Sequence, residues 1–143
     1  DEICSAVINL SSRKEGALIV IQRSSDLTLH LQGSTKLNSD IFGPLIEATF
    51  HKDNSMHDGG MYIAIGRVRA VRCVLPVTQR NDIPAELGMR HRAALGLAEK
   101  TDALIIVVSE ETGLISIAMD GELHRGIATN DLQEIVEKEL KPR

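Results

Sequence analysis

Two apolar runs that contain β-branched residues constrain the possible fold of this chain most strongly. They are ALIVI at 17–21 and ALIIVV at 103–108. Runs of this length and composition are typical of buried strands. They are far shorter than the roughly 20 apolar residues that a membrane-spanning helix needs. Apolar residues at helical spacing in 1–12 and again in 130–140 predict helices that pack by one face. Strands that alternate with helices predict an α/β fold.

Two consecutive hairpins predict that the central sheet is mixed rather than purely parallel. In the first, the strands 61–65 and 69–75 are joined by a tight turn at Gly66. In the second, strand 103–108 is followed by the turn SEETG and a strand at 114–119. The absence of repeats and linker-like stretches predicts a single domain, residues 1–143, with helices flanking the sheet.

Two further helices are expected between the strands. One begins at a cap on Asn38 or Ser39, holds Pro44 within its first turns, and reaches about Phe50. The other follows Gly88 and runs to about Lys100. The segment 27–37 fits either a short strand or an irregular loop.

The composition argues against binding to nucleic acid or to an anionic membrane surface. The formal net charge is −4, and the chain has no Trp, one Tyr and two Phe, so it offers neither a basic surface nor aromatic side chains on which bases could stack. Any basic cluster is therefore expected to act locally, on a small anion.

The segment HDGG, at 57–60, is the first candidate for chemistry. Asp58 can hold a divalent metal or accept a proton from a hydroxyl, and His57 can assist as a ligand. Gly59 and Gly60 let the backbone approach a ligand closely, because no Cβ intervenes. Taken alone, the segment is more typical of a turn in which Asp58 stabilises its own backbone, since Asp-Gly is a common turn dipeptide.

The segment GMRHR, at 88–92, places three residues that can carry a proton in the first turn of a predicted helix. The free N–H groups and the dipole of a helix start favour an anion and disfavour cations, so a bound phosphate would explain this placement. Residues i and i+2 lie about 200° apart on a helix, so Arg90 and Arg92 cannot point the same way. The alternative is a solvated basic turn that pairs with nearby acids.

The segment SEETG, at 109–113, follows a buried strand directly. Ligands of α/β sheets gather at the carboxyl ends of strands, so Ser109 is a candidate phosphate ligand and Glu110 or Glu111 a candidate metal ligand beside Asp58. The alternative is a charged hairpin turn. Together, the three segments fit a nucleotide with a divalent metal.

The combination of HDGG, then LGMRHRAALG, then VSEETG resembles the catalytic domain of the diadenylate cyclases over about residues 3–140. It looks closest to the class in which this domain follows N-terminal membrane helices. The resemblance implies a cytoplasmic domain of a bacterial protein, held at the inner face of the cell membrane only through an anchor that precedes Asp1.

The resemblance implies that two ATP molecules condense to cyclic di-AMP and two pyrophosphates with Mg²⁺ or Mn²⁺. Because the product is symmetric, two protomers must present their nucleotides to each other, in a homodimer or higher homo-oligomer. Two alternatives remain: a catalytically quiet module that senses ATP or cyclic di-AMP, and a metal-dependent nucleotide hydrolase.

The resemblance also implies roles for individual residues. Asp58 would promote attack by the 3′-hydroxyl, next to the metal. The implied catalytic residues are Asp58, Gly59, Arg90, His91 and Arg92. The implied ATP contacts are Gly60, Leu75 near the adenine, Met89, Ser109, Glu110 and Glu111. The implied metal ligands are His57, Asp58 and a glutamate of 110–111.

The chain departs from the family pattern at three positions. Gly60 stands where the family usually has Ala, a change that we expect to be tolerated. Met89 replaces a usual Thr, which removes one hydroxyl contact to phosphate. Val74 lies where some members place an aromatic residue against the adenine.

Overall fold

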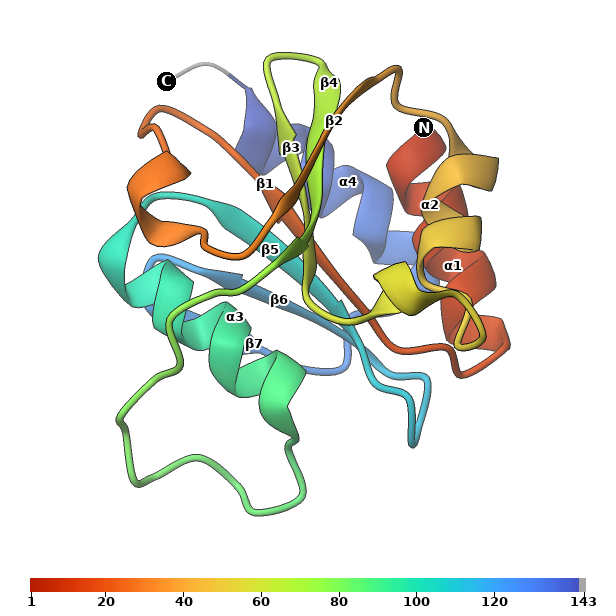
Figure 1. Ribbon diagram of the computed structural model, residues 1–143. Helices are drawn as coiled ribbons and strands as arrows, with labels where there is room; N and C mark the ends of the chain where they lie inside the picture. Colours follow the sequence, from red (N-terminus) through yellow and green to blue (C-terminus); the bar gives the residue numbers. More distant parts are fainter. Residues whose placement is uncertain (142–143) are drawn as a thin grey trace.

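The computed structural model describes residues 1–141, which form a seven-stranded sheet with helices on both faces (Figure 1). The helices are α1 (Glu2–Ser12), α2 (Gly43–Thr49), α3 (Met89–Lys100) and α4 (Thr129–Leu140). The strands are β1 (Ala17–Ile21), β2 (Thr35–Ser39), β3 (Gly60–Ala64), β4 (Arg67–Cys73), β5 (Leu104–Val108), β6 (Ile115–Met119) and β7 (Glu122–His124). Two short 3₁₀ turns, η1 (Thr28–His30) and η2 (Ser55–His57), complete the described elements.

The strand order is β2-β4-β3-β1-β5-β6-β7, and the prediction of a mixed sheet is confirmed. β1 pairs with β3 in parallel, whereas the other neighbouring strands pair in antiparallel orientation. β1 and β5 lie at the centre, and each of their residues is buried. This explains why these two runs are apolar throughout: both of their faces are covered.

Two apolar cores lie on opposite faces of the sheet. Alternate residues of β1 divide between them, with Ile19 in one core and Val20 in the other. The first core packs under α1, α2 and α4, and the second packs under α3 (Figure 1). Asp1 caps α1 by accepting a hydrogen bond from the backbone N–H of Cys4 at 2.8 Å, which supports the predicted helix start.

The predicted helix start at Asn38 or Ser39 needs correction, and one strand has to be added. The cap at Asn38 or Ser39 is wrong, because Ser39 belongs to β2, which pairs with β4. The helix begins instead at Gly43, after an extended Phe42, with Pro44 in its first turn. A short strand at 122–124 was not predicted. It forms because the turn at Asp120 and Gly121, both with positive φ, folds it back onto β6.

One edge of the sheet collects chain segments that are far apart in the sequence. Because β5 runs antiparallel to β1, its last residue, Val108, pairs with the first residue of β1, Ala17. β3 runs parallel to β1, so its start, at Gly60, lies at the same edge. The segments before β1, before β3 and after β5 therefore meet there.

The helix α3 is held close to the chain after β4. A Cβ added to Gly96 would overlap the carbonyl oxygen of Pro76, and the backbone N–H of Thr78 donates to the carbonyl oxygen of Arg92 at 3.0 Å. Gly96 thus admits the backbone of residues 76–78, while the small side chains of Ala94 and Ala98 face the sheet core.

Among residues 1–141, no helix is long and apolar enough to cross a membrane.

Candidate active site

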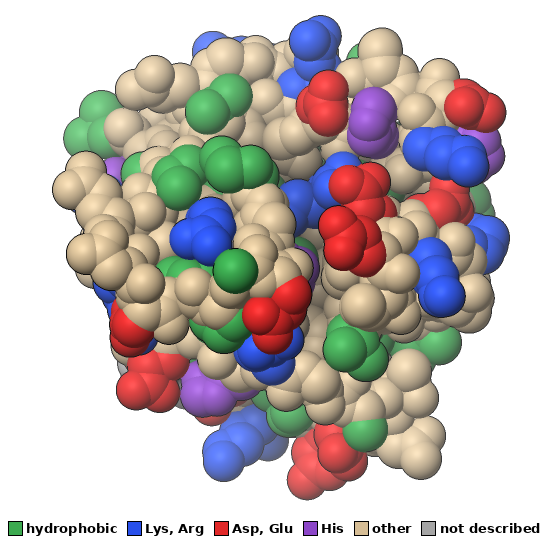
Figure 2. All heavy atoms as spheres, turned by 90° about the horizontal axis from the view of Figure 1, so that it is seen from below, with side chains coloured by type: hydrophobic (Ala, Val, Ile, Leu, Met, Phe, Trp, Pro, Cys, Tyr) green, Lys and Arg blue, Asp and Glu red, His purple; other side chains and the backbone are tan. Residues whose placement is uncertain are grey.

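A cleft of about 390 Å³ opens at the edge of the sheet where these segments meet. It lies between the segment 57–59, the start of α3, and the turn that follows β5. Figure 2, a view from below, shows acidic and basic side chains gathered around a hollow near the middle of this face. Three widely separated motifs of the sequence thus border one cavity.

Most of the predicted site residues line this cleft. They are His57, Asp58, Gly59, Met89, Arg90, His91, Ser109, Glu110 and Glu111. Gly60, Leu75 and Arg92 do not line it; Gly60 and Leu75 are buried, and Leu75 is only 5% exposed. Glu86, Gly88 and Val108 line the cleft but were not predicted, because neither their type nor their spacing marks them out.

The pair His57 and Asp58 presents two acceptor atoms side by side. The Nδ1 atom of His57 lies 2.7 Å from the carbonyl oxygen of Asn54. Since a carbonyl only accepts, Nδ1 must carry the proton, and in neutral His57 the Nε2 atom is then an acceptor. This Nε2 lies 3.5 Å from a carboxylate oxygen of Asp58, whose side chain is 83% exposed. A cation, either a metal ion or a proton on Nε2, could therefore be shared between these two atoms.

Gly59 allows Asp58 to stand at the rim of the cleft. Its φ is +79°, and an added Cβ would lie 2.7 Å from the backbone carbonyl carbon of Arg72. The segment therefore presses directly on β4, which a side chain would prevent. At Gly60 an added Cβ would meet first a methyl group of Leu75 at 3.2 Å, a contact that a small side-chain movement can relieve.

The guanidinium of Arg90 lies over the backbone of Gly16. An added Cβ on Gly16 would come within 2.6 Å of an Nη atom of Arg90, so this glycine makes room for the arginine. The same Arg90 forms an ion pair of 3.6 Å with Glu110, and its side chain is only 22% exposed. Sequence reasoning gave Gly16 no role, because a glycine before a buried strand shows nothing about what packs on it.

His91 is buried and electrically different from its two neighbours. Burial lowers the pKa of His91 from its usual value of 6.5, and the positive charges of Arg125 and Arg90 lower the pKa further. Its Nδ1 atom is buried, and no residue within 1–141 makes a hydrogen bond to it. At neutral pH the RHR segment is therefore two cations flanking a neutral imidazole.

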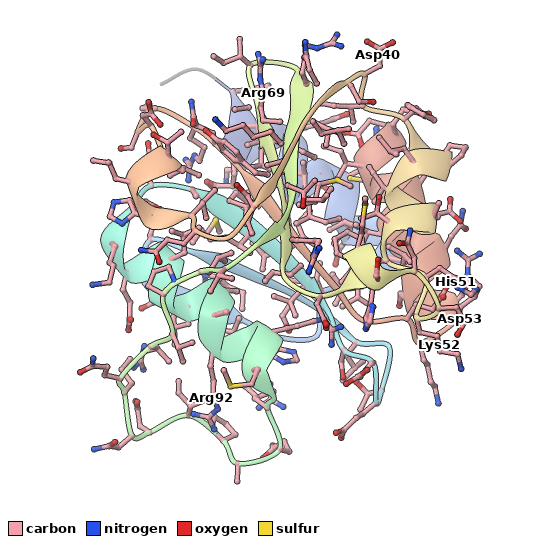
Figure 3. All side chains as sticks on the ribbon, in the orientation of Figure 1. Asp40, His51, Lys52, Asp53, Arg69 and Arg92 are labelled. Carbon is pink, nitrogen blue, oxygen red and sulfur yellow. The ribbon has the colours of Figure 1, made fainter. Side chains whose placement is uncertain are left out.

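Arg92 lies away from the cleft. Figure 3 shows it beside the loop between β4 and α3, on the side of the helix away from the turn after β5. This agrees with the prediction that Arg90 and Arg92 diverge, because they are two residues apart on a helix. Arg92 therefore does not line the cleft that Asp58 borders.

The turn that carries Ser109 is fixed by its own hydrogen bonds. The Ser109 hydroxyl oxygen accepts from the backbone N–H groups of Glu111 and Thr112, each at 3.2 Å. The Ser11 hydroxyl of α1 donates to the carbonyl oxygen of Gly113 at 2.5 Å, which ties the turn to the end of that helix. The hydroxyl hydrogen of Ser109 stays available to donate to a ligand.

No three His, Cys, Asp or Glu side chains in the described part of the chain are close enough together to hold a metal ion. The predicted set of His57, Asp58, Glu110 and Glu111 borders one cleft but does not converge on one point. Any metal here would draw further ligands from a bound molecule.

A family model described as "DisA bacterial checkpoint controller nucleotide-binding" matches residues 4–123, most of the chain. The chain belongs to this family. It is 45% identical over 122 residues to a protein named diadenylate cyclase CdaS from Bacillus thuringiensis, covering 85% of this chain and 61% of that protein. It is 36% identical over 141 residues to cyclic di-AMP synthase CdaA from Bacillus subtilis, covering 99% of this chain and 52% of that protein.

The fold matches a solved member. The structure of a double mutant of DacA from Staphylococcus aureus superposes with a TM-score of 0.93 at 34% identity, covering 96% of this chain and 92% of that one. The chain thus spans between about half and three fifths of the length of the curated relatives above.

The two glycines of HDGG should respond differently to the same substitution. Gly59→Ala should lower the free energy of unfolding by about 2 kcal/mol, because it combines a left-handed φ with a backbone clash. Gly60→Ala should lower it by less than about 1 kcal/mol, because only side-chain atoms of Leu75 and Leu18 must move. Urea unfolding of the two variants measures both values; equal losses would contradict this account of Gly59.

The depressed pKa of His91 makes a prediction for stability. The unfolded chain takes up a proton at this residue near pH 6.5, which the folded state resists, so the protein should lose stability as the pH falls below that value. An NMR titration should show the His91 ring titrating below 6.5. Arg125→Ala should raise this pKa, whereas Arg67→Ala, which removes an arginine paired with Asp40, should leave it unchanged. Titration of His91 at or above 6.5 would contradict the burial argument.

Proposed function

We propose that this chain is the catalytic domain of a diadenylate cyclase, which condenses two ATP molecules to cyclic di-AMP and two pyrophosphates. The observation that carries the proposal is the shared cleft, which is lined by Asp58, by the start of α3 and by the Ser109 turn. The family of the chain and the names of its relatives support the same reaction.

The start of α3 is suited to bind the phosphates. Its N-cap is Gly88, which provides no side chain to satisfy the first N–H groups of the helix. These N–H groups and the helix dipole attract an anion, and Arg90 adds a guanidinium that can pair with phosphate oxygens. A neutral His91 can donate or accept a hydrogen bond there. The phosphate contact assigned to Arg92 stays a prediction, because this side chain lies outside the cleft.

The chemistry is an in-line displacement at each α-phosphorus. The 3′-oxygen of one ATP forms a bond to the α-phosphorus of the other, the bond from that phosphorus to the bridging oxygen breaks, and pyrophosphate leaves. Asp58 accepts or directs the proton of the 3′-hydroxyl. Two such steps close the ring of cyclic di-AMP.

A divalent metal, Mg²⁺ or Mn²⁺, fits the residues present. Mg²⁺ in phosphoryl-transfer sites is typically held by one or two carboxylates together with substrate phosphates, and Asp58 supplies such a carboxylate. The acceptor Nε2 of His57, 3.5 Å from Asp58, can join it, and the side chains of Glu110 and Glu111 border the same cleft. When bound, the metal would lower the charge on the phosphates and favour loss of the hydroxyl proton.

Two protomers must act together. Each nucleotide is both the attacking and the attacked molecule, so one protomer with one ATP cannot complete the product. The Asp58 side chain is 83% exposed, which suits a carboxylate that serves a nucleotide held by a second copy. Val74, 59% exposed next to the buried Leu75, is an apolar surface for the adenine on the same proposal. Met89, 65% exposed, is the first residue of α3, where we expect the phosphates.

Incubation with ATP and Mn²⁺, followed by chromatography, tests the reaction. We expect cyclic di-AMP; absence of turnover would indicate a sensing module, and ADP or AMP would indicate a hydrolase. Asp58→Asn should bind ATP but form product at least about 100-fold more slowly, because it loses the proton acceptor and the metal carboxylate. Undiminished turnover by this variant would exclude the role given to Asp58.

The dependence of the rate on protein concentration tests the need for two protomers. If the active dimer is weak, the rate per protomer should fall when the protein is diluted below the dimer dissociation constant, because fewer facing pairs of sites remain. Sedimentation at the same concentrations gives the dimer fraction. A constant rate per protomer while the dimer dissociates would contradict the two-protomer mechanism.

A further inference from the structure

A second cavity, of about 430 Å³, adjoins the cleft. It is formed by residues 13–16, at the end of α1 and the start of β1, and by residues 50–52, after α2. It shares His57, Arg90 and Glu110 with the cleft, so these three side chains lie between the two cavities and border both. Figure 3 shows His51 and Lys52 beyond the ends of α1 and α2, in this region.

The cavity carries an excess of positive charge in a chain of net charge −4. Its cations are Arg13, Lys14, Lys52 and Arg90, and its acids are Glu15 and Glu110. With both histidines neutral, the lining has an excess of two positive charges.

The acids of the cavity are already occupied by other partners. Glu15 lies 2.7 Å from Arg13 and 3.9 Å from His51, and Arg13 also pairs with Glu47 at 2.7 Å. Glu110 pairs with Arg90. Within residues 1–141, neither Lys14 nor Lys52 forms an ion pair, although both border the cavity. These two ammonium groups are therefore the unneutralised charges.

Arg90 connects this charge to the start of α3. Its guanidinium lies over Gly16, the residue between the Lys14 region and β1, at the junction of the two cavities. The guanidinium fills the space over Gly16 and lines both cavities, so it can pair with an anion at the first N–H groups of α3 and with one in the cavity that Lys14 and Lys52 border. An anion that contacts the helix start, Arg90 and these lysines in turn is a chain of phosphates rather than a single phosphate.

We infer that this second cavity is a pyrophosphate subsite in which Lys14 and Lys52 bind the β- and γ-phosphates of ATP and the pyrophosphate that they become. The inference rests on the proposed function for the source of the pyrophosphate, but the binding site itself does not require turnover. On the proposed function, Asp58 and the start of α3 then hold the reacting α-phosphate, while the leaving group occupies the basic cavity. Neither lysine belongs to the motifs singled out in the sequence.

The test is the binding of inorganic pyrophosphate with Mg²⁺, measured by calorimetry on the wild-type protein and on the double variant Lys14→Gln/Lys52→Gln. Glutamine keeps most of the side-chain length and removes the charge. We expect the affinity for pyrophosphate to fall about tenfold, as expected for the loss of two solvent-accessible charge contacts. The affinity for cyclic di-AMP should change less than about twofold, because this molecule has no β- or γ-phosphate.

Two matched variants control for charge and for folding. Lys100→Gln removes an exposed lysine at the far end of α3 and should leave pyrophosphate affinity unchanged. Lys14→Arg/Lys52→Arg keeps both charges and should retain most of the affinity. Equal pyrophosphate affinity in the wild type and the glutamine double variant would overturn the inference. So would an equal loss of affinity for cyclic di-AMP, since that would indicate a change of the whole site.

Measuring ATP affinity in the same variants distinguishes whether the lysines bind the phosphate tail of the substrate or the pyrophosphate product. Measuring cyclic di-AMP formation separates this inference from the proposed function. A parallel loss of affinity for ATP shows that the lysines hold the tail before reaction, and an effect on pyrophosphate alone shows that they act on the product; both support the subsite. If the wild-type protein forms no cyclic di-AMP, the proposed function fails, whereas lysine-dependent pyrophosphate binding would still support the cavity as a binding site.

Discussion

The antiparallel pairing of β5 with β1 at the centre of the sheet is the constraint on which the site depends. It sets Val108 opposite Ala17, so the turn that begins at Ser109 emerges beside Gly16 rather than at the opposite edge. Parallel pairing would have sent the glutamates of this turn to the far end of the sheet, away from Asp58. This strand direction brings Glu110 within reach of Arg90 for an ion pair. It also places Gly16 under the Arg90 guanidinium.

Charge in this protein is organised locally rather than globally. An acidic chain concentrates cations around one edge of its sheet, where two arginines flank a histidine whose burial keeps it neutral. Placing Arg90 at the start of a helix is unfavourable without an anion, because the helix dipole repels it. The ion pair between a guanidinium nitrogen of Arg90 and a carboxylate oxygen of Glu110, 3.6 Å apart, offsets part of this repulsion. A bound polyphosphate would replace that partner with a stronger one, so ligand binding and the rearrangement of Glu110 are expected to be coupled.

Three glycines allow close packing around the site because they have no side chain. Gly16 leaves space for a guanidinium, and Gly59 lets the backbone that carries Asp58 lie against β4. Gly96 does the same for α3, which can approach the segment after β4 closely enough for Thr78 to donate to Arg92. In each case the functional residue is fixed by a neighbour with no side chain, which is why a list of chemically active residues does not by itself describe the site.

The amino-acid sequence alone determined most of the helices and strands, and it predicted which segments carry the chemistry. The apolar runs at 17–21 and 103–108 indicated central strands, and HDGG, RHR and SEETG indicated a nucleotide site, because burial and helix or strand period are local properties that a residue pattern records. The cap of α2 and the strand β7 were predicted wrongly or not at all, since both depend on pairing with β4 and β6. Only the tertiary structure decided that Arg90 lines the cleft and Arg92 does not, and that His91 is neutral. It also decided that Gly16 lies next to the site, together with two lysines that form no ion pair within residues 1–141. These are consequences of strand direction and of close contacts between segments distant in the chain, and no local pattern encodes such contacts.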